Sequence, residues 1–248
     1  MTYQKINMIQ LKKHWSLHAV AIIIVAAWYY MFFLMTMNMA PVTQWSYLDI
    51  IVLFSMWSIM MAGMMLPSAL PIFHLIEKIN DQRKARNAPY AASFYFIIGY
   101  LLAWLGYSLA ITLLQWWFHH LALLTPMMNS AQLEFTCLIL LISGVYQWLP
   151  IKQRCLNYCR SPLGFLTSSW QEGIAGAIKM GFCHGQYCLG CCWLLMTLLL
   201  IFGVMSLPWI IALTLIVAIE KLFAHGLIFS KILGALLVFL ACYMWFMN

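Results

Sequence analysis

Residues 183–193, CHGQYCLGCCW, combine one histidine with four cysteines inside an otherwise apolar stretch. On a helix, at about 100° per residue, a single stripe about 100° wide holds His184, Cys188, Cys191 and Cys192. Cys183 points in the other direction. Imidazole and thiolate donors in surroundings of low dielectric constant suit a soft metal, Cu(I) or Zn(II). Buried cysteines also act as small packing residues, but this density of donors favours a metal site.

A second group of soft donors lies in WSIMMAGMMLPSALP, residues 57–71. Its candidate ligands lie in two rows at helical i, i+4 spacing: Met60 with Met64, and Met61 with Met65. Thioethers favour Cu(I) and are poor ligands for Zn(II), although methionine also fills gaps between packed helices. Pro67 and Pro71 are expected to bend or end this helix near the inner membrane surface.

A third group lies in KQRCLNYCRSP, residues 152–162, which we expect in a cytoplasmic loop. Cys155 and Cys159 are four residues apart, and the basic residues around them favour the thiolate form. Two thiolates at this spacing can hold one Cu(I) or form a redox pair. Further along, Glu220 and Lys221 are expected to pair with each other or to extend toward the membrane interface.

Three other features carry weaker signals. MTMNM, residues 35–39, together with the pair His119 and His120 and the methionines at 127–128, predicts either an external entry site or ordinary interfacial packing. Cys137 and Cys242 stand alone in apolar segments, and we predict that both are packing residues.

The elements that must position these donors are membrane helices. With 65% hydrophobic and 8% charged residues, the chain lacks the polar surface that a water-soluble globular domain needs. We predict an all-α transmembrane bundle, a single integral membrane domain over residues 1–248, with about seven spans. The spans are expected near residues 17–37, 48–66, 90–115, 131–150, 179–203, 207–227 and 229–247. The longest loops are expected at 78–90 and 151–178.

The basic residues predict the orientation. All 13 Lys and Arg fall in alternate inter-span segments, on what would be one side of the bilayer. The positive-inside rule assigns that side to the cytoplasm, which places the amino terminus inside and the carboxyl terminus outside. The net charge of +7 is therefore explained without nucleic acid as a partner.

The predicted fifth span carries small residues at a spacing of four: Gly173, Ala177, Gly181 and Gly185. Such a ridge lets a neighbouring helix approach closely, so the donors on the overlapping stripe are expected to face protein rather than lipid. Gly181, Gly185 and Gly190 could equally permit a break in the helix that lines an enclosed cavity.

Five segments together resemble a bacterial membrane family, the domain-of-unknown-function family 2182, which is described as predicted metal-binding integral membrane proteins and often as copper chaperones. The segments are WSIMMAGMMLPSALP, GYLLAW, YQWLPIKQRCLNYCRSP, GFCHGQYCLGCCWLLM and GVMSLPWIIALTLIVAIEK. The resemblance covers about residues 48–226. It implies ligands at Cys155, Cys159, Cys188, Cys191 and Cys192, with the Met60–Met65 group beside them.

The favoured hypothesis is a multi-pass protein of the bacterial inner membrane that acts in copper acquisition, delivery or chaperoning. It would hold Cu(I) in the bilayer and pass it to a membrane or cytoplasmic client. One alternative is a thiol–disulfide oxidoreductase that uses the CxxC of Cys188/Cys191 and the CxxxC of Cys155/Cys159. Others are a metal-stabilised subunit of a larger membrane complex and a Zn(II) site. The sequence contains no HExxH, P-loop or Rossmann motif, which favours a non-enzymatic role.

Overall fold

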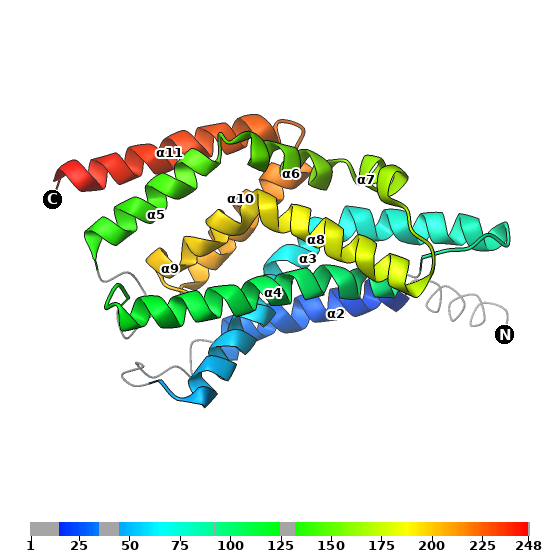
Figure 1. The fold of residues 1–248 in the computed structure, drawn as a ribbon, viewed down its shortest axis with the longest axis horizontal. Helices are drawn as coiled ribbons and strands as arrows, with labels where there is room; N and C mark the ends of the chain where they lie inside the picture. The colour runs from blue at the N-terminus through cyan, green and yellow to red at the C-terminus, as the bar shows by residue number, and fades with distance from the viewer. Residues whose placement is uncertain (1–14, 35–44, 92, 125–131, 248) are drawn as a thin grey trace.

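The computed structural model describes residues 15–34, 45–91, 93–124 and 132–247, and the regular elements in these ranges are helices (Figure 1). The elements, in order, are α2 (Trp15–Tyr29), the π-helix η1 (Tyr30–Leu34), α3 (Tyr47–Ala85), α4 (Ser93–His120), α5 (Leu133–Tyr146), α6 (Pro150–Arg160), α7 (Pro162–Ser169), α8 (Gly173–Thr197), α9 (Leu199–Phe202), α10 (Leu207–Leu222) and α11 (Gly226–Met247). The predicted all-α class is confirmed.

Five helical segments in the described ranges are long and apolar enough to cross a membrane: α2 with η1, α3, α4, α8 with α9, and α11. A sixth is reached if α5 and α6, which meet at a bend of 63°, count as one broken or re-entrant span. The predicted number of seven is not confirmed. The shortfall lies at residues 207–227, where α10 has only 16 residues.

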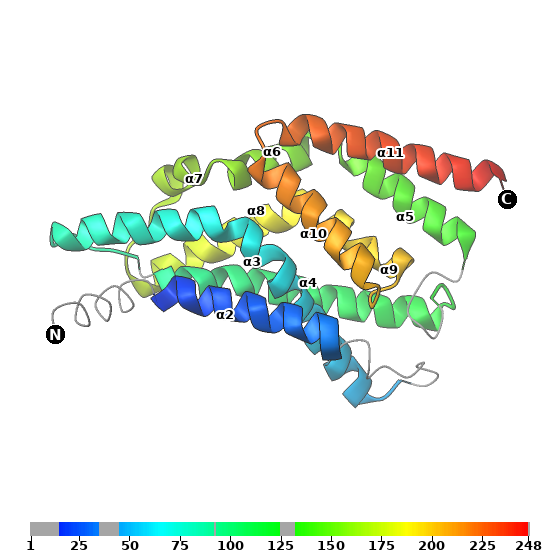
Figure 2. The ribbon, with the colours of Figure 1, turned by 180° about the vertical axis from the view of Figure 1, so that it is seen from behind.

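A bend and an end were the two outcomes expected at the prolines of α3, and the helix does not end there. It continues past residue 66, through Pro67 and Pro71, to Ala85, and it bends along its length (Figure 2). A proline at position 67 removes the N–H that would bond the carbonyl of Gly63. Trp28 Nε1 of α2 donates to that carbonyl instead, at 3.2 Å. A neighbouring helix therefore satisfies the acceptor that Pro67 leaves free, as membrane bundles require.

The expected loop at 151–178 is also corrected. Residues 150–169 form α6 and α7, each with a proline, Pro150 or Pro162, in its first turn. Proline is tolerated there because its missing N–H has no partner inside the helix. Helix α6 packs on α8, and α7 packs on α3. Cys155 and Cys159 therefore lie on a helix that folds back against the bundle.

Helix α8 runs between α4 and α6 (Figure 1). Gly181 lies against the carbonyl of Phe96 so closely that a Cβ could not be added there, and Gly99 on α4 is similarly close to the carbonyl of Ile178. This close approach confirms the predicted small-residue packing face at Gly181 and Gly185, whereas Gly173, at the start of α8, is exposed and has no neighbour within 4 Å of an added Cβ. Because α8 continues unbroken from Gly173 to Thr197, the alternative of a break in this segment is not observed.

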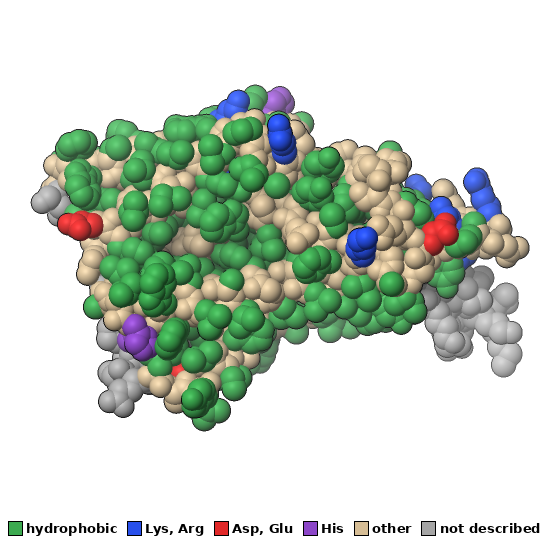
Figure 3. Space-filling view, viewed as in Figure 1, with side chains coloured by type: hydrophobic (Ala, Val, Ile, Leu, Met, Phe, Trp, Pro, Cys, Tyr) green, Lys and Arg blue, Asp and Glu red, His purple; other side chains and the backbone are tan. Residues whose placement is uncertain are grey.

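Apolar side chains dominate the exposed surface, as the composition predicts. On the face drawn in Figure 3, Lys and Arg side chains gather over α6, α8 and the far end of α3, and not over the end where α5 begins and α11 finishes. This uneven distribution agrees with the basic bias along the chain. The orientation itself stays a prediction.

Candidate metal centre

The four donors predicted on one stripe of α8 all point into the protein. His184, Cys188, Cys191 and Cys192 are between 0% and 3% exposed, whereas Cys183, which was predicted to point elsewhere, is only partly buried. The helical period alone therefore predicted which side chains of this motif face the interior.

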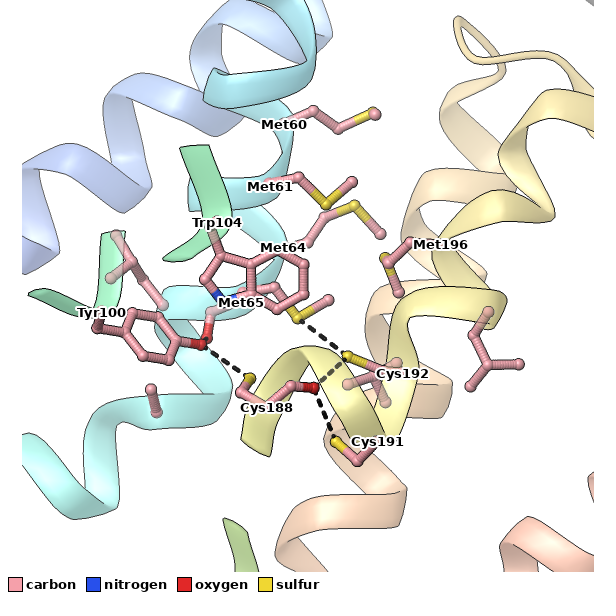
Figure 4. Packing of buried hydrophobic residues seen from close by; sticks show 14 of the residues in the cluster. Met60, Met61, Met64, Met65, Tyr100, Trp104, Cys188, Cys191, Cys192 and Met196 are labelled. Atoms are coloured by element: carbon pink, nitrogen blue, oxygen red, sulfur yellow. Dashed lines mark hydrogen bonds between the residues drawn. The ribbon is translucent and has the colours of Figure 1, made fainter. Parts of the chain in front are cut away.

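Cys188 lies at the centre of the cluster. Its Sγ is 3.1 Å from the hydroxyl of Tyr100 on α4 and accepts a hydrogen bond of 2.9 Å from Nζ of Lys221 on α10. The Tyr100 hydroxyl also donates to the carbonyl of Met65, at 3.2 Å. Side chains of α4 and α10 therefore contact this sulfur atom, and the Tyr100 hydroxyl links it to α3. Figure 4 shows the contact between Tyr100 and Cys188.

The thiols of Cys191 and Cys192 are turned toward their own helix. Each donates to the carbonyl of Cys188, at 3.0 Å. Such local bonds to the preceding turn compete with contacts to other groups. The Cys192 sulfur also lies 4.0 Å from Sδ of Met65 on α3, which brings a thioether to the cluster.

The cysteines of α6 were predicted as an equivalent pair, and the structure separates their roles. The Cys159 side chain interacts with those of both Cys188 and Cys191. Cys155 instead lies against Gly190, where an added Cβ would be 2.6 Å from its sulfur. Cys159 therefore belongs to the thiol cluster, and Cys155 lies at its border.

The four candidate methionines of α3 are all buried, with at most 1% of the residue exposed. Met65 is the one that reaches the cysteines, because its Sδ contacts Cys192. Met60, Met61 and Met64 follow it along α3, away from Cys188 (Figure 4). They form a continuous column of thioethers that leads away from the cluster.

His184 packs among aromatic rings. Its imidazole centroid is 5.1 Å from that of Phe165, 6.0 Å from Tyr100 and 6.1 Å from Phe96. Nδ1 is buried and, in the described part of the chain, has no hydrogen-bond partner. Buried polar atoms are normally satisfied, so this nitrogen is available to a ligand.

The expected pairing of Glu220 with Lys221 is wrong. The Glu220 carboxylate accepts hydrogen bonds of 2.8 and 3.0 Å from Nζ of Lys152 on α6, and this ion pair is buried. Gln147 and Ser230 complete the network. Lys221 turns the other way, to Cys188. The sequence motifs did not assign Lys221 or Tyr100 to the site, because only the packing of α4 and α10 against α8 brings these side chains to the cysteines.

A pocket of about 180 Å³ lies beside the cluster. Its lining includes Ser68 from α3, Cys159 and Arg160 from α6, His184 from α8 and Lys221 from α10. Cys159 thus faces both the pocket and the other thiols. We call this cavity the Cys159 pocket.

The donor chemistry fits Cu(I), a soft ion that prefers thiolates and thioethers. As they stand, however, the described residues contain no group of three or more His, Cys, Asp or Glu side chains arranged to hold a metal ion. The contacts explain this, because the thiols of Cys191 and Cys192 are bonded to a carbonyl. Side-chain rotation that breaks these two bonds, at a cost of about 0.5–1.5 kcal/mol each, would free both sulfur atoms for a metal ion.

The weaker candidates lie elsewhere. His119 Nδ1 accepts a hydrogen bond of 3.0 Å from Trp45 Nε1, and the His120 ring contacts the carbonyl of Trp116. MTMNM and the methionines at 127–128 lie outside the described residues. Cys137 is buried, as predicted for a packing residue, but Cys242 is exposed, and both line one pocket between α5 and α11.

A comparison with protein families gives a match over most of the chain. A family model described as PpoB2, copper chaperone, matches residues 54–244. This range includes α4 to α10, nearly all of α3 and α11, and every candidate ligand. No curated protein and no solved structure matches the chain.

Proposed function

The chain belongs to the PpoB2 copper chaperone family, and we propose that it holds Cu(I) within a membrane and passes the ion to a client protein. The ligands in this proposal are Cys159, Cys188, Cys191 and Cys192, with Met65 and His184 beside them. Copper is the cargo of the protein in this reading. The membrane is the bacterial inner membrane, and the client is a membrane or cytoplasmic protein.

The observation that carries the proposal is the convergence of three buried thiols of α8 with the partly buried Cys159 of α6 in an apolar bundle. Sulfur donors select for soft ions, and the buried cluster keeps Cu(I) from water. Because thiolates rather than thiols bind metals, copper uptake releases protons.

The Cys159 pocket supports a route for exchange. Cys159 lines the pocket and also contacts Cys188 and Cys191, so an ion bound first at Cys159 moves inward by exchange between sulfur ligands. Copper stays Cu(I) throughout, and no electron donor is required. The predicted orientation opens this pocket toward the cytoplasm, and a reporter fused after Lys84 is expected to be active on that side.

Metal analysis of the purified full chain tests the function. After loading with Cu(I) under reducing conditions, we expect about one or more copper ions per chain to survive gel filtration, with all eight cysteines reduced, as they are in the structure. Bound copper should fall as the pH falls, because protons compete for the thiolates. A protein that stays metal-free and forms a disulfide between α6 and α8 would instead support the thiol oxidoreductase.

Cys159→Ser and Cys155→Ser form a matched pair on one helix. We expect Cys159→Ser to slow Cu(I) release to a chelator, because it removes the thiol that lines the pocket and through which the ion would exchange. Cys155→Ser should release copper at nearly the parent rate. Equal release rates in the two variants, measured by stopped-flow absorbance, would refute exchange through this pocket.

A further inference from the structure

A buried ammonium lies inside the thiol cluster. Lys221 is 7% exposed, and its Nζ lies 2.9 Å from Cys188 Sγ, 3.3 Å from Ser68 Oγ and 3.9 Å from Met65 Sδ. A lysine ammonium has three N–H donors and no acceptor. These three contacts therefore use its full donor capacity, and the side chain is held in place beside the sulfur atoms.

The carboxylate expected from the sequence to pair with Lys221 does not neutralise this charge. Glu220, the adjacent residue, is bonded by both oxygens to Lys152. A buried ammonium needs a nearby negative charge. Of the three groups that Lys221 contacts, only Cys188 can carry that charge, as a thiolate, because Ser68 and Met65 are neutral.

We propose that Lys221 sets the charge preference of the sulfur cluster, so that it accepts a monovalent metal ion and disfavours a divalent one. The inference rests on the proposed function and deepens it, since it names the residue that selects Cu(I) over Zn(II). Lys221 is a positioning residue here. It has no acceptor and cannot itself bind a metal.

The charge count explains the preference. The count applies to an ion bound by two of the four cysteines as thiolates, with the other two still protonated. These two thiolates and the Lys221 ammonium together carry one negative charge, which Cu(I) reduces to zero and Zn(II) turns into one net positive charge. An uncompensated charge in a buried site is weakly screened and costly. Without Lys221 the balance is reversed, because two thiolates with Zn(II) are neutral while two thiolates with Cu(I) remain anionic.

The geometry allows the ammonium to stay when the metal arrives. Lys221 and Ser68 both line the Cys159 pocket, so Nζ can keep its bond to Ser68 Oγ while the Cys188 sulfur turns to the ion. The positive charge then remains within a few ångströms of the bound metal. Its effect on metal choice therefore persists in the loaded protein.

The test compares metal preference in Lys221→Met, which removes the charge at similar side-chain length, and in Lys221→Arg, which keeps it. The full chain in detergent is titrated with Cu(I) and, separately, with Zn(II), each against a competing chelator of known affinity. An opposite charge within about 4–6 Å shifts an ionisation equilibrium by about 10- to 1,000-fold. We expect Lys221→Met to shift the ratio of Cu(I) to Zn(II) affinity toward Zn(II) by a factor in this range, and Lys221→Arg to keep the parent ratio.

A purely structural role for Lys221 predicts a different result. Loss of packing would weaken both metals together and leave the ratio unchanged, and that outcome would overturn the proposal. If Lys221→Met does not fold, Lys221→Gln, which is neutral but retains N–H donors, must show the same shift. Failure of the parent chain to bind Cu(I) would instead refute the proposed function.

Discussion

Replacing Cys188 and Cys192 together by serine should abolish copper retention. The double variant removes the sulfur that contacts Tyr100 and Lys221 and the sulfur nearest Met65. Serine hydroxyls are hard, neutral donors that do not replace thiolates for a soft ion. Because changes at outer partners alone cost about 10–100-fold in metal affinity, we expect a loss greater than about 100-fold. Copper per chain after gel filtration measures it.

Cys137→Ser and Cys242→Ser are the matched controls. Both cysteines lie in the pocket between α5 and α11, apart from the thiol cluster, so both variants should retain copper at the parent level. The same copper content in the Cys188→Ser/Cys192→Ser protein and in these controls would exclude the cluster as the binding site.

The second large effect is expected on stability, at the buried ion pair between α6 and α10. Lys152 and Glu220 have almost no exposed side-chain surface. Lys152→Met leaves the Glu220 carboxylate buried without its counter-charge, which typically costs about 3–5 kcal/mol. For a chain of this size, that loss lowers the thermal unfolding midpoint by roughly 6–20 °C. Thermal denaturation of the purified protein in detergent measures the shift.

The double variant Lys152→Met/Glu220→Gln should recover most of this loss, because replacing both members of a buried ion pair is often neutral. Lys231→Met, at an exposed lysine on α11, should change the stability by no more than about 0.5 kcal/mol. A single Lys152→Met substitution as mild as Lys231→Met would show that the pair does not hold α6 to α10.

Residue types and periodicity were enough to predict the helical class, several of the apolar spans and the inward stripe of α8. Each of these depends on local rules. Long apolar runs are satisfied internally only as helices in lipid, and residues three or four positions apart share one face of a helix. The glycine spacing likewise predicted close packing, which α4 provides at Gly181.

Local rules were insufficient at the prolines and in the segment expected as a loop. Pro67 and Pro71 were expected to bend or end the helix, but Trp28 supplies the hydrogen bond that Pro67 removes, and α3 bends and continues (Figure 2). The segment 151–178 looked polar enough for a loop. Contacts with α8 and α3 stabilise α6 and α7 there instead, and such contacts cannot be read from a short window of sequence.

The sequence by itself determined which chemistry is present: soft sulfur donors on helices in an apolar chain. Only the tertiary structure decided which donors meet. It brings Cys159 rather than Cys155 to Cys188, selects Met65 from its row, and turns Lys221 to the sulfur while Glu220 binds Lys152. The physical reason is that helical period determines the face on which a side chain lies, whereas its partner depends on how helices distant in sequence pack.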